Sequence, residues 1–110
     1  MAAKTFHNNS NQFLHVTLLI RQGNNIQKPS LEQEFTLDPG ESKNVSYGNN
    51  SNIYLNGLVF NWKDKNLQAM MTKRQEVIAT GSAPTFDWVL NTHSILTING
   101  VGPMNVSASN

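Results

Sequence analysis

The fold of this chain is decided by the stretch Phe13-Leu14-His15-Val16-Thr17-Leu18-Leu19-Ile20-Arg21. Its even-numbered positions are all aliphatic, whereas its odd-numbered positions mix apolar, polar and charged side chains. An apolar period of two is typical of a β-strand with one buried face and one partly covered face. We therefore expect a strand over residues 13–21.

Short alternating segments of the same kind recur along the chain at a spacing of about ten residues. They cover residues 5–8, 34–37, 43–47, 53–62, 85–90 and 95–98. Asparagine-rich turns separate them, because the short amide of Asn bonds to nearby backbone and tolerates a left-handed conformation. The pattern predicts a single all-β domain over residues 1–110, an antiparallel sandwich or small barrel of seven to eight short strands.

The turn at residues 38–41 has Pro at its second position and Gly at its third, which predicts a type II turn. A hairpin around it would place Phe35, Leu37, Val45 and Tyr47 on one face. This pattern of turn and strands, over about fifteen residues, resembles patterns common in immunoglobulin-like sandwiches. The resemblance implies an immunoglobulin-like or related β-sandwich.

Gly57 lies in the middle of the segment 53–62, and the apolar positions change parity there. Ile53 and Leu55 are odd-numbered, whereas Leu58 and Phe60 are even-numbered. A β-bulge at the glycine accounts for the change, because a bulge inserts one extra residue into a strand.

Residues 66–79 fit two different structures. Leu67, Met70, Met71 and Arg74 have helical spacing, which predicts one short helix. The alternative is a hairpin around residues 64–66, followed by a second strand. We favour strands, because every flanking segment is β.

The composition excludes several classes of partner. Net charge is +1, and no stretch collects enough Lys or Arg to neutralise several phosphates, so we expect no nucleic-acid binding. The N-terminus lacks the apolar core of a signal peptide and no run is long enough for a membrane span, so we expect no membrane insertion. The chain is then cytoplasmic or exported by a non-classical route, and the absence of cysteine does not choose between these.

The histidines offer little for a metal. A first hairpin turning at Asn11 would bring His7 and His15 to about 5 Å from each other on one face. A zinc site needs a third and a fourth ligand, for which the sequence offers only His93 or a carboxylate. We expect no metal and no cofactor.

Catalysis is not indicated either. Ser82 lacks the surrounding glycines of a nucleophile elbow, and the chain has no cysteine. A triad of Ser82, His93 and Asp87 would depend on geometry that spacing cannot supply. We expect a protein without catalytic residues, and not an enzyme.

The first functional hypothesis is a binding or self-assembly module that contacts other proteins. Phe13, His15 and Leu19 lie on the second face of the long strand, where a partner subunit could cover them. Open sandwiches also have edge strands that pair with a second copy. On this hypothesis the chain forms a homo-oligomer.

The alternative hypothesis is a lectin-like module for neutral glycans. Trp62 and Tyr54 would offer aromatic faces, and Asn56 and Asn61 would offer amides beside them. Trp62 precedes the charged turn 63–65 and is the residue that we nominate for an exposed binding face. Trp88 alternates as a core residue does, so we assign it to the core.

Overall fold

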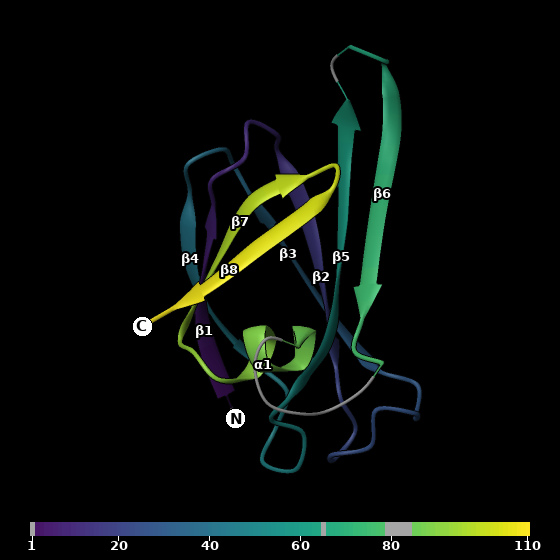
Figure 1. Ribbon diagram of the computed structural model, residues 1–110, viewed down its shortest axis with the longest axis vertical. Helices are drawn as coiled ribbons and strands as arrows, with labels where there is room; N and C mark the ends of the chain where they lie inside the picture. Colours follow the sequence, from purple (N-terminus) through teal and green to yellow (C-terminus); the bar gives the residue numbers. More distant parts are fainter. Residues whose placement is uncertain (1, 65, 79–84) are drawn as a thin grey trace.

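The computed structural model describes residues 2–64, 66–78 and 85–110, which form a two-layered β-sandwich with one short helix (Figure 1). The elements in chain order are β1 (Ala2–Asn8), β2 (Leu14–Ile20), β3 (Leu31–Leu37), β4 (Ser42–Tyr47), β5 (Leu55–Asp64), β6 (Ala69–Glu76), α1 (Phe86–Asn91), β7 (Ile95–Val101) and β8 (Met104–Ser109). The predicted all-β sandwich is confirmed.

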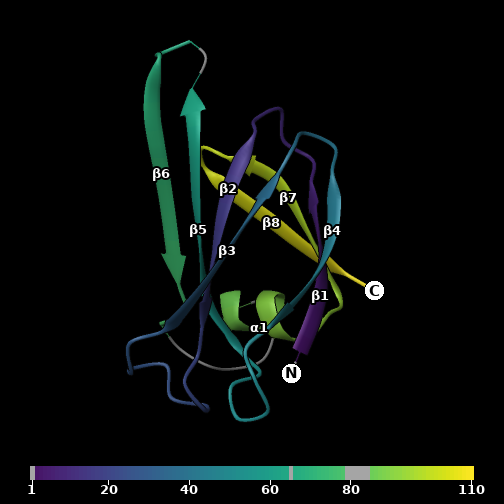
Figure 2. The ribbon, with the colours of Figure 1, turned by 180° about the vertical axis from the view of Figure 1, so that it is seen from behind.

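Each layer is a four-stranded sheet. One has the strand order β4-β1-β7-β8 and the other has the order β3-β2-β5-β6. Neighbouring strands are antiparallel except β1 and β7, which are parallel. Figures 1 and 2 show the two layers from opposite sides.

The even-numbered side chains of β2 face the interior, as the alternation predicts. Leu14, Val16 and Leu18 are fully buried there. They join apolar side chains from both sheets and from α1 in one hydrophobic cluster. This shared burial holds the two layers together, because removing apolar surface from water is the main favourable term in folding.

The first two strands do not form the hairpin that we expected. β1 belongs to one sheet and β2 to the other. His7 therefore lies opposite Ser42, whereas His15 lies opposite Thr36 and Asn61. The predicted juxtaposition of His7 and His15 is wrong, because the loop between the strands crosses from one layer to the other.

The turn at residues 38–41 is also a crossing between layers. Gly40 has φ +81°, and the backbone N–H of Glu41 donates to the carbonyl oxygen of Asp38 at 3.0 Å, as a type II turn requires. The predicted hairpin is wrong, because β3 pairs with β2 and β4 pairs with β1. Phe35 and Leu37 of β3 and Val45 and Tyr47 of β4 still face the common core.

The bulge at Gly57 is confirmed. Leu19 pairs with Gly57 and Ile20 pairs with Leu55, so Asn56 is the extra residue. A Cβ atom at Gly57 would lie 2.6 Å from the carbonyl oxygen of Gln75. Only glycine fits between the neighbouring strands at this position.

The segment 66–78 contains strand β6 and no helix, so the helical alternative is wrong for these residues. β6 pairs with β5 from Gly57 opposite Glu76 to Asp64 opposite Ala69. The hairpin extends beyond the rest of the sandwich (Figure 1). Most of β6 is exposed as a result.

The expected strand over residues 85–90 is instead helix α1. The hydroxyl oxygen of Thr85 accepts a hydrogen bond from the N–H of Trp88 at 3.1 Å and caps the helix. Phe86, Val89 and Leu90 pack on the core, a spacing typical of one helical face. Trp88, which we assigned to the core, is only half-buried, because it lies off this face.

Candidate functional site

The residues that we expected to bind a ligand or partner do not form one site. They are Phe13, His15, Leu19, Tyr54, Asn56, Asn61 and Trp62. Phe13 is 53% exposed and His15 and Asn61 are neighbours on the outer face of the β3-β2-β5-β6 sheet. Tyr54 and Trp62 lie at opposite ends of β5. The predicted aromatic platform is therefore wrong.

Leu19 is not open to a partner. Its Cδ1 atom lies 2.9 Å from the position that a Cβ atom on Gly57 would occupy, so the side chain covers the glycine. Leu19 is only 1% exposed, and Thr17 on the same face is buried as well. The chain itself covers the Thr17 and Leu19 end of the face that we assigned to self-association, whereas Phe13 at the other end is exposed.

Trp62 is 6% exposed, so its nomination as an exposed binding residue is wrong. The bulge at Gly57 turns the even-numbered side chains of the rest of β5 inward, which places Trp62 in the hydrophobic cluster. Asn56 is buried too. Its Oδ1 accepts a hydrogen bond from Nε of Arg21 at 3.1 Å, a structural role.

The described histidines and carboxylates do not form a metal-binding cluster. Nδ1 of His7 lies 2.6 Å from Oγ of Ser42, and Nε2 of His15 lies 3.6 Å from a carboxylate oxygen of Glu34. Within residues 2–64, 66–78 and 85–110, no group of three or more His, Asp or Glu side chains could hold a metal ion. Ser82 of the hypothetical triad lies outside the described residues.

A hollow of about 630 Å³ opens where three segments meet at one end of the sandwich. The loop 9–12 between β1 and β2, the end of β5 and the turn between β7 and β8 enclose it. Its lining residues are Asn9, Ser10, Asn11, Gln12, Trp62, Asp64, Asn99, Gly100, Val101, Gly102, Pro103 and Asn105. We call this hollow the Trp62 pocket.

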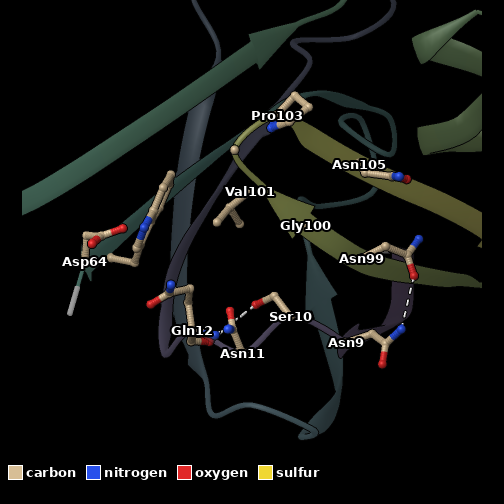
Figure 3. Close-up of a pocket in the computed structure, with 12 residues that line it drawn as sticks. Asn9, Ser10, Asn11, Gln12, Asp64, Asn99, Gly100, Val101, Pro103 and Asn105 are labelled. Carbon is tan, nitrogen blue, oxygen red and sulfur yellow. Dashed lines mark hydrogen bonds between the residues drawn. The ribbon is translucent and has the colours of Figure 1, made fainter. Parts of the chain in front are cut away.

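Figure 3 shows how these side chains are arranged. Asp64 lies on one side of the pocket, and Asn99 and Asn105 lie on the other, with Val101 between them. The loop that carries Asn11 closes the lower side in this view. The pocket is therefore ringed by polar groups around a small apolar centre.

Asn8 fixes the loop 9–12. The side chain is fully buried, and its Oδ1 accepts hydrogen bonds from both N and Oγ of Ser10, at 3.0 and 2.6 Å. Its Nδ2 donates to the carbonyl oxygens of Gln12 and Leu37. A buried amide that is satisfied in this way holds its loop in one conformation.

Asn99 is the extra residue of a second bulge, because Ile98 pairs with Val106 and Gly100 pairs with Asn105. Bulges redirect side chains next to binding sites. The Oδ1 atom of Asn99 accepts from Nδ2 of Asn9 at 3.3 Å, which links the bulge of β7 to the loop 9–12 (Figure 3).

Asp64 is the one ionisable residue among the described residues that line the Trp62 pocket. Its Oδ1 accepts hydrogen bonds from the backbone N–H groups of Asn66 and Leu67, both at 2.9 Å. These two bonds orient the carboxylate and do not use Oδ2. A charged acceptor therefore lies beside Trp62, among amides that both donate and accept.

The sequence identified several of these pocket residues only as parts of turns. Asn8-Asn9 and Gly100-Val101-Gly102-Pro103 have the composition of turns, but they lie more than 90 residues apart in the sequence. Their meeting depends on the parallel pairing of β1 with β7, which alternation does not encode. The clustering of amides in these turns was the available signal.

No protein-family model, no curated protein and no solved structure matches this chain. Among the described residues, no helix has the length and apolar character needed to cross a membrane.

Proposed function

We propose that this protein is a lectin-like module that binds a neutral glycan in the Trp62 pocket. The observation that carries the proposal is the lining of that pocket, which combines five side-chain amides, a hydroxyl and one carboxylate beside the largely buried indole of Trp62. Sugar hydroxyls donate and accept at once, as side-chain amides do, so the two kinds of group match. A volume of about 630 Å³ falls in the range of ligand pockets.

The charge of the pocket favours a neutral ligand over an anion. Among the residues that the structure describes, its lining includes Asp64 and no Lys, Arg or His. A phosphate or carboxylate ligand would meet this negative charge without a cation to offset it. A sugar hydroxyl can instead donate to Oδ2 of Asp64, and hydrogen bonds to a carboxylate are among the stronger ones.

A glycan array probed with the labelled protein tests the proposal. We expect binding to neutral oligosaccharides, reduced in a double Asn11→Ala and Asn105→Ala variant, because both amides line the pocket and are exposed. Asn44→Ala is the matched control, since Asn44 is exposed on β4, outside the pocket. An array without a neutral ligand, or equal loss in the control, contradicts the proposal.

Asp64→Asn separates the role of the charge from that of the fold. The amide oxygen can still accept from Asn66 and Leu67, so the turn is preserved. The loss of the charged acceptor weakens glycan binding about fivefold to tenfold, the difference between a charged and a neutral hydrogen bond. Tighter binding of the variant would show that Asp64 repels the ligand.

Self-association through β6 is the second candidate. β6 is the last strand of its sheet in the described chain and is exposed along seven of its eight residues. An unpaired edge of this kind can accept a strand from a second copy. Light scattering at two concentrations a hundredfold apart tests it: a dimer that Met70→Lys dissociates supports pairing at β6, and a monomer at both concentrations contradicts it.

A further inference from the structure

A second hollow, of about 240 Å³, lies at the opposite end of the sandwich from the Trp62 pocket. It is enclosed by α1, the loop after β2 and the residue before β5. Helix α1 lies in the lower part of the molecule in Figure 1. Its lining residues are Arg21, Asn24, Tyr54, Asp87, Trp88, Asn91 and Thr92. We call it the Trp88 pocket.

The base of the Trp88 pocket is a rigid network around Arg21. This guanidinium is 2% exposed, and its Nη2 donates to Oδ1 of Asp87 at 2.6 Å and to the carbonyl oxygen of Leu55 at 3.1 Å. Nδ2 of Asn91 also donates to Asp87, at 3.0 Å. These bonds tie α1 to the start of β5, so the pocket is formed before any ligand arrives.

Two aromatic side chains form the walls. Tyr54 is 36% exposed, and the guanidinium carbon of Arg21 lies over its ring, 5.6 Å from the ring centroid. Trp88 is half-buried, with the ring of His93 against it at 4.9 Å between centroids. Both rings are therefore fixed by contacts within the chain, yet both border the pocket.

The chemistry of the pocket again selects a neutral ligand. The charge of Arg21 is offset by Asp87 in direct contact with it, which disfavours both an anion and a cation. Asn24 is exposed at the rim, where Nη1 of Arg21 donates to its Oδ1 and orients its amide. Aromatic walls with a few fixed polar groups suit the apolar face and hydroxyl edge of a sugar.

We propose that the Trp88 pocket is a second glycan-binding site and that the protein is bivalent. The two pockets lie at the two ends of β5, eight residues apart from Tyr54 to Trp62, or roughly 25 Å along a strand. One sugar ring cannot occupy both, so the two sites can bind two chains and cross-link them. The ligand class rests on the proposed function, whereas the pocket itself does not.

The two tryptophans of the chain allow each pocket to be observed separately, because Trp62 lines one and Trp88 lines the other. Trp62→Phe leaves Trp88 as the sole indole, and Trp88→Phe leaves Trp62. Each variant is titrated with the methyl glycosides of glucose, galactose, mannose and N-acetylglucosamine. We expect a saturable fluorescence change in both variants, and we expect Tyr54→Ala to abolish the change of Trp88 alone.

The outcomes separate this inference from the proposed function. A response of Trp62 with none from Trp88 overturns the second site and leaves the first. A fluorescence response of Trp88 with none from Trp62 overturns the first site and leaves the second. The absence of a response from either tryptophan overturns both sites.

Because Trp62 is buried and its replacement can disturb the fold, calorimetry on the unmodified chain provides a second measurement. We expect two sugars bound per chain, reduced to one by Tyr54→Ala, which changes an exposed side chain. Agglutination of beads coated with the bound glycan should be lost in the same variant. One sugar per chain before and after the change contradicts bivalency.

Discussion

Arg21 and Asp87 form an ion pair whose removal should be among the most costly single changes in this protein. The side chain of Arg21 is 2% exposed and that of Asp87 is 15% exposed, so water screens the pair little. Arg21→Met removes the cation and leaves the Asp87 carboxylate without it. Breaking a buried pair on one side costs about 3 to 5 kcal/mol, because an uncompensated charge remains in the interior.

The loss can be measured by urea unfolding, with the combined fluorescence of Trp62 and Trp88 as the probe. A domain of this size has a free energy of unfolding of about 5 to 15 kcal/mol, so the variant is expected to remain folded but strongly destabilised. Arg74→Met is the matched control. Arg74 pairs with Glu76 at 3.3 Å, but both side chains are about half exposed, and we expect no measurable change.

A double-mutant cycle identifies the cause of the loss. Asp87→Asn removes the charge but keeps an oxygen that can accept from Arg21 and Asn91. If the pair is coupled, Arg21→Met with Asp87→Asn costs less than the sum of the single changes, by about 0.5 to 3 kcal/mol. Strict additivity would refute the reasoning, since it would show that neither residue depends on the charge of the other.

Three further changes test the packing. Burial raises the pKa of Tyr47 to about 12. About 2 to 3 kcal/mol of folding stability that is present below pH 10 should therefore be lost as the pH rises toward 12. Unfolding curves of Tyr47→Phe, measured in parallel, should not show this loss. Gly57→Ala should cost about 1 to 3 kcal/mol in urea unfolding, because the new Cβ atom would lie 2.6 Å from the Gln75 carbonyl oxygen. Gly48→Ala should lower the melting temperature more than Gly23→Ala, since both have positive φ but only the Cβ atom at 48 would meet backbone, at 1.9 Å.

The strands could be predicted because alternation reports local burial directly. Residues 14–20 place Leu14, Val16 and Leu18 inward, as their even positions indicate. The change of parity at Gly57 likewise predicts the bulge, because an extra residue must reverse which positions face the core. These features depend on neighbouring residues alone.

The pairing of the strands could not be predicted in the same way. Leu37 and Tyr47 are both buried. Both would also be buried if their strands formed a hairpin instead of belonging to two facing sheets. The inner faces of a sandwich are equally apolar, so an alternating pattern does not say which layer a strand joins. The predicted pairing of His7 with His15 was wrong for the same reason, because β1 and β2 belong to different sheets.

Helix α1 was missed for a related reason. Phe86, Trp88 and Leu90 alternate, but Phe86, Val89 and Leu90 also have helical spacing, and six residues are too few to separate the two periods. The cap at Thr85 was the signal that favours the helix, since its side chain accepts from the N–H three residues on.

The asparagine pairs explain why turns and pockets coincide at the ends of this sandwich. In Asn8-Asn9, the first amide bonds to the backbone of its own turn and the second lines the Trp62 pocket. In Asn24-Asn25, Asn25 accepts from the backbone of Gln27 at 2.9 Å and Asn24 lines the Trp88 pocket. In these two pairs, one member therefore bonds to the backbone of its loop and the other lines a pocket. Replacing Asn8 or Asn25, whose amides bond to the backbone of their own loops, should lower the free energy of unfolding. Replacing Asn9 or Asn24 should change ligand binding more than it changes the free energy of unfolding.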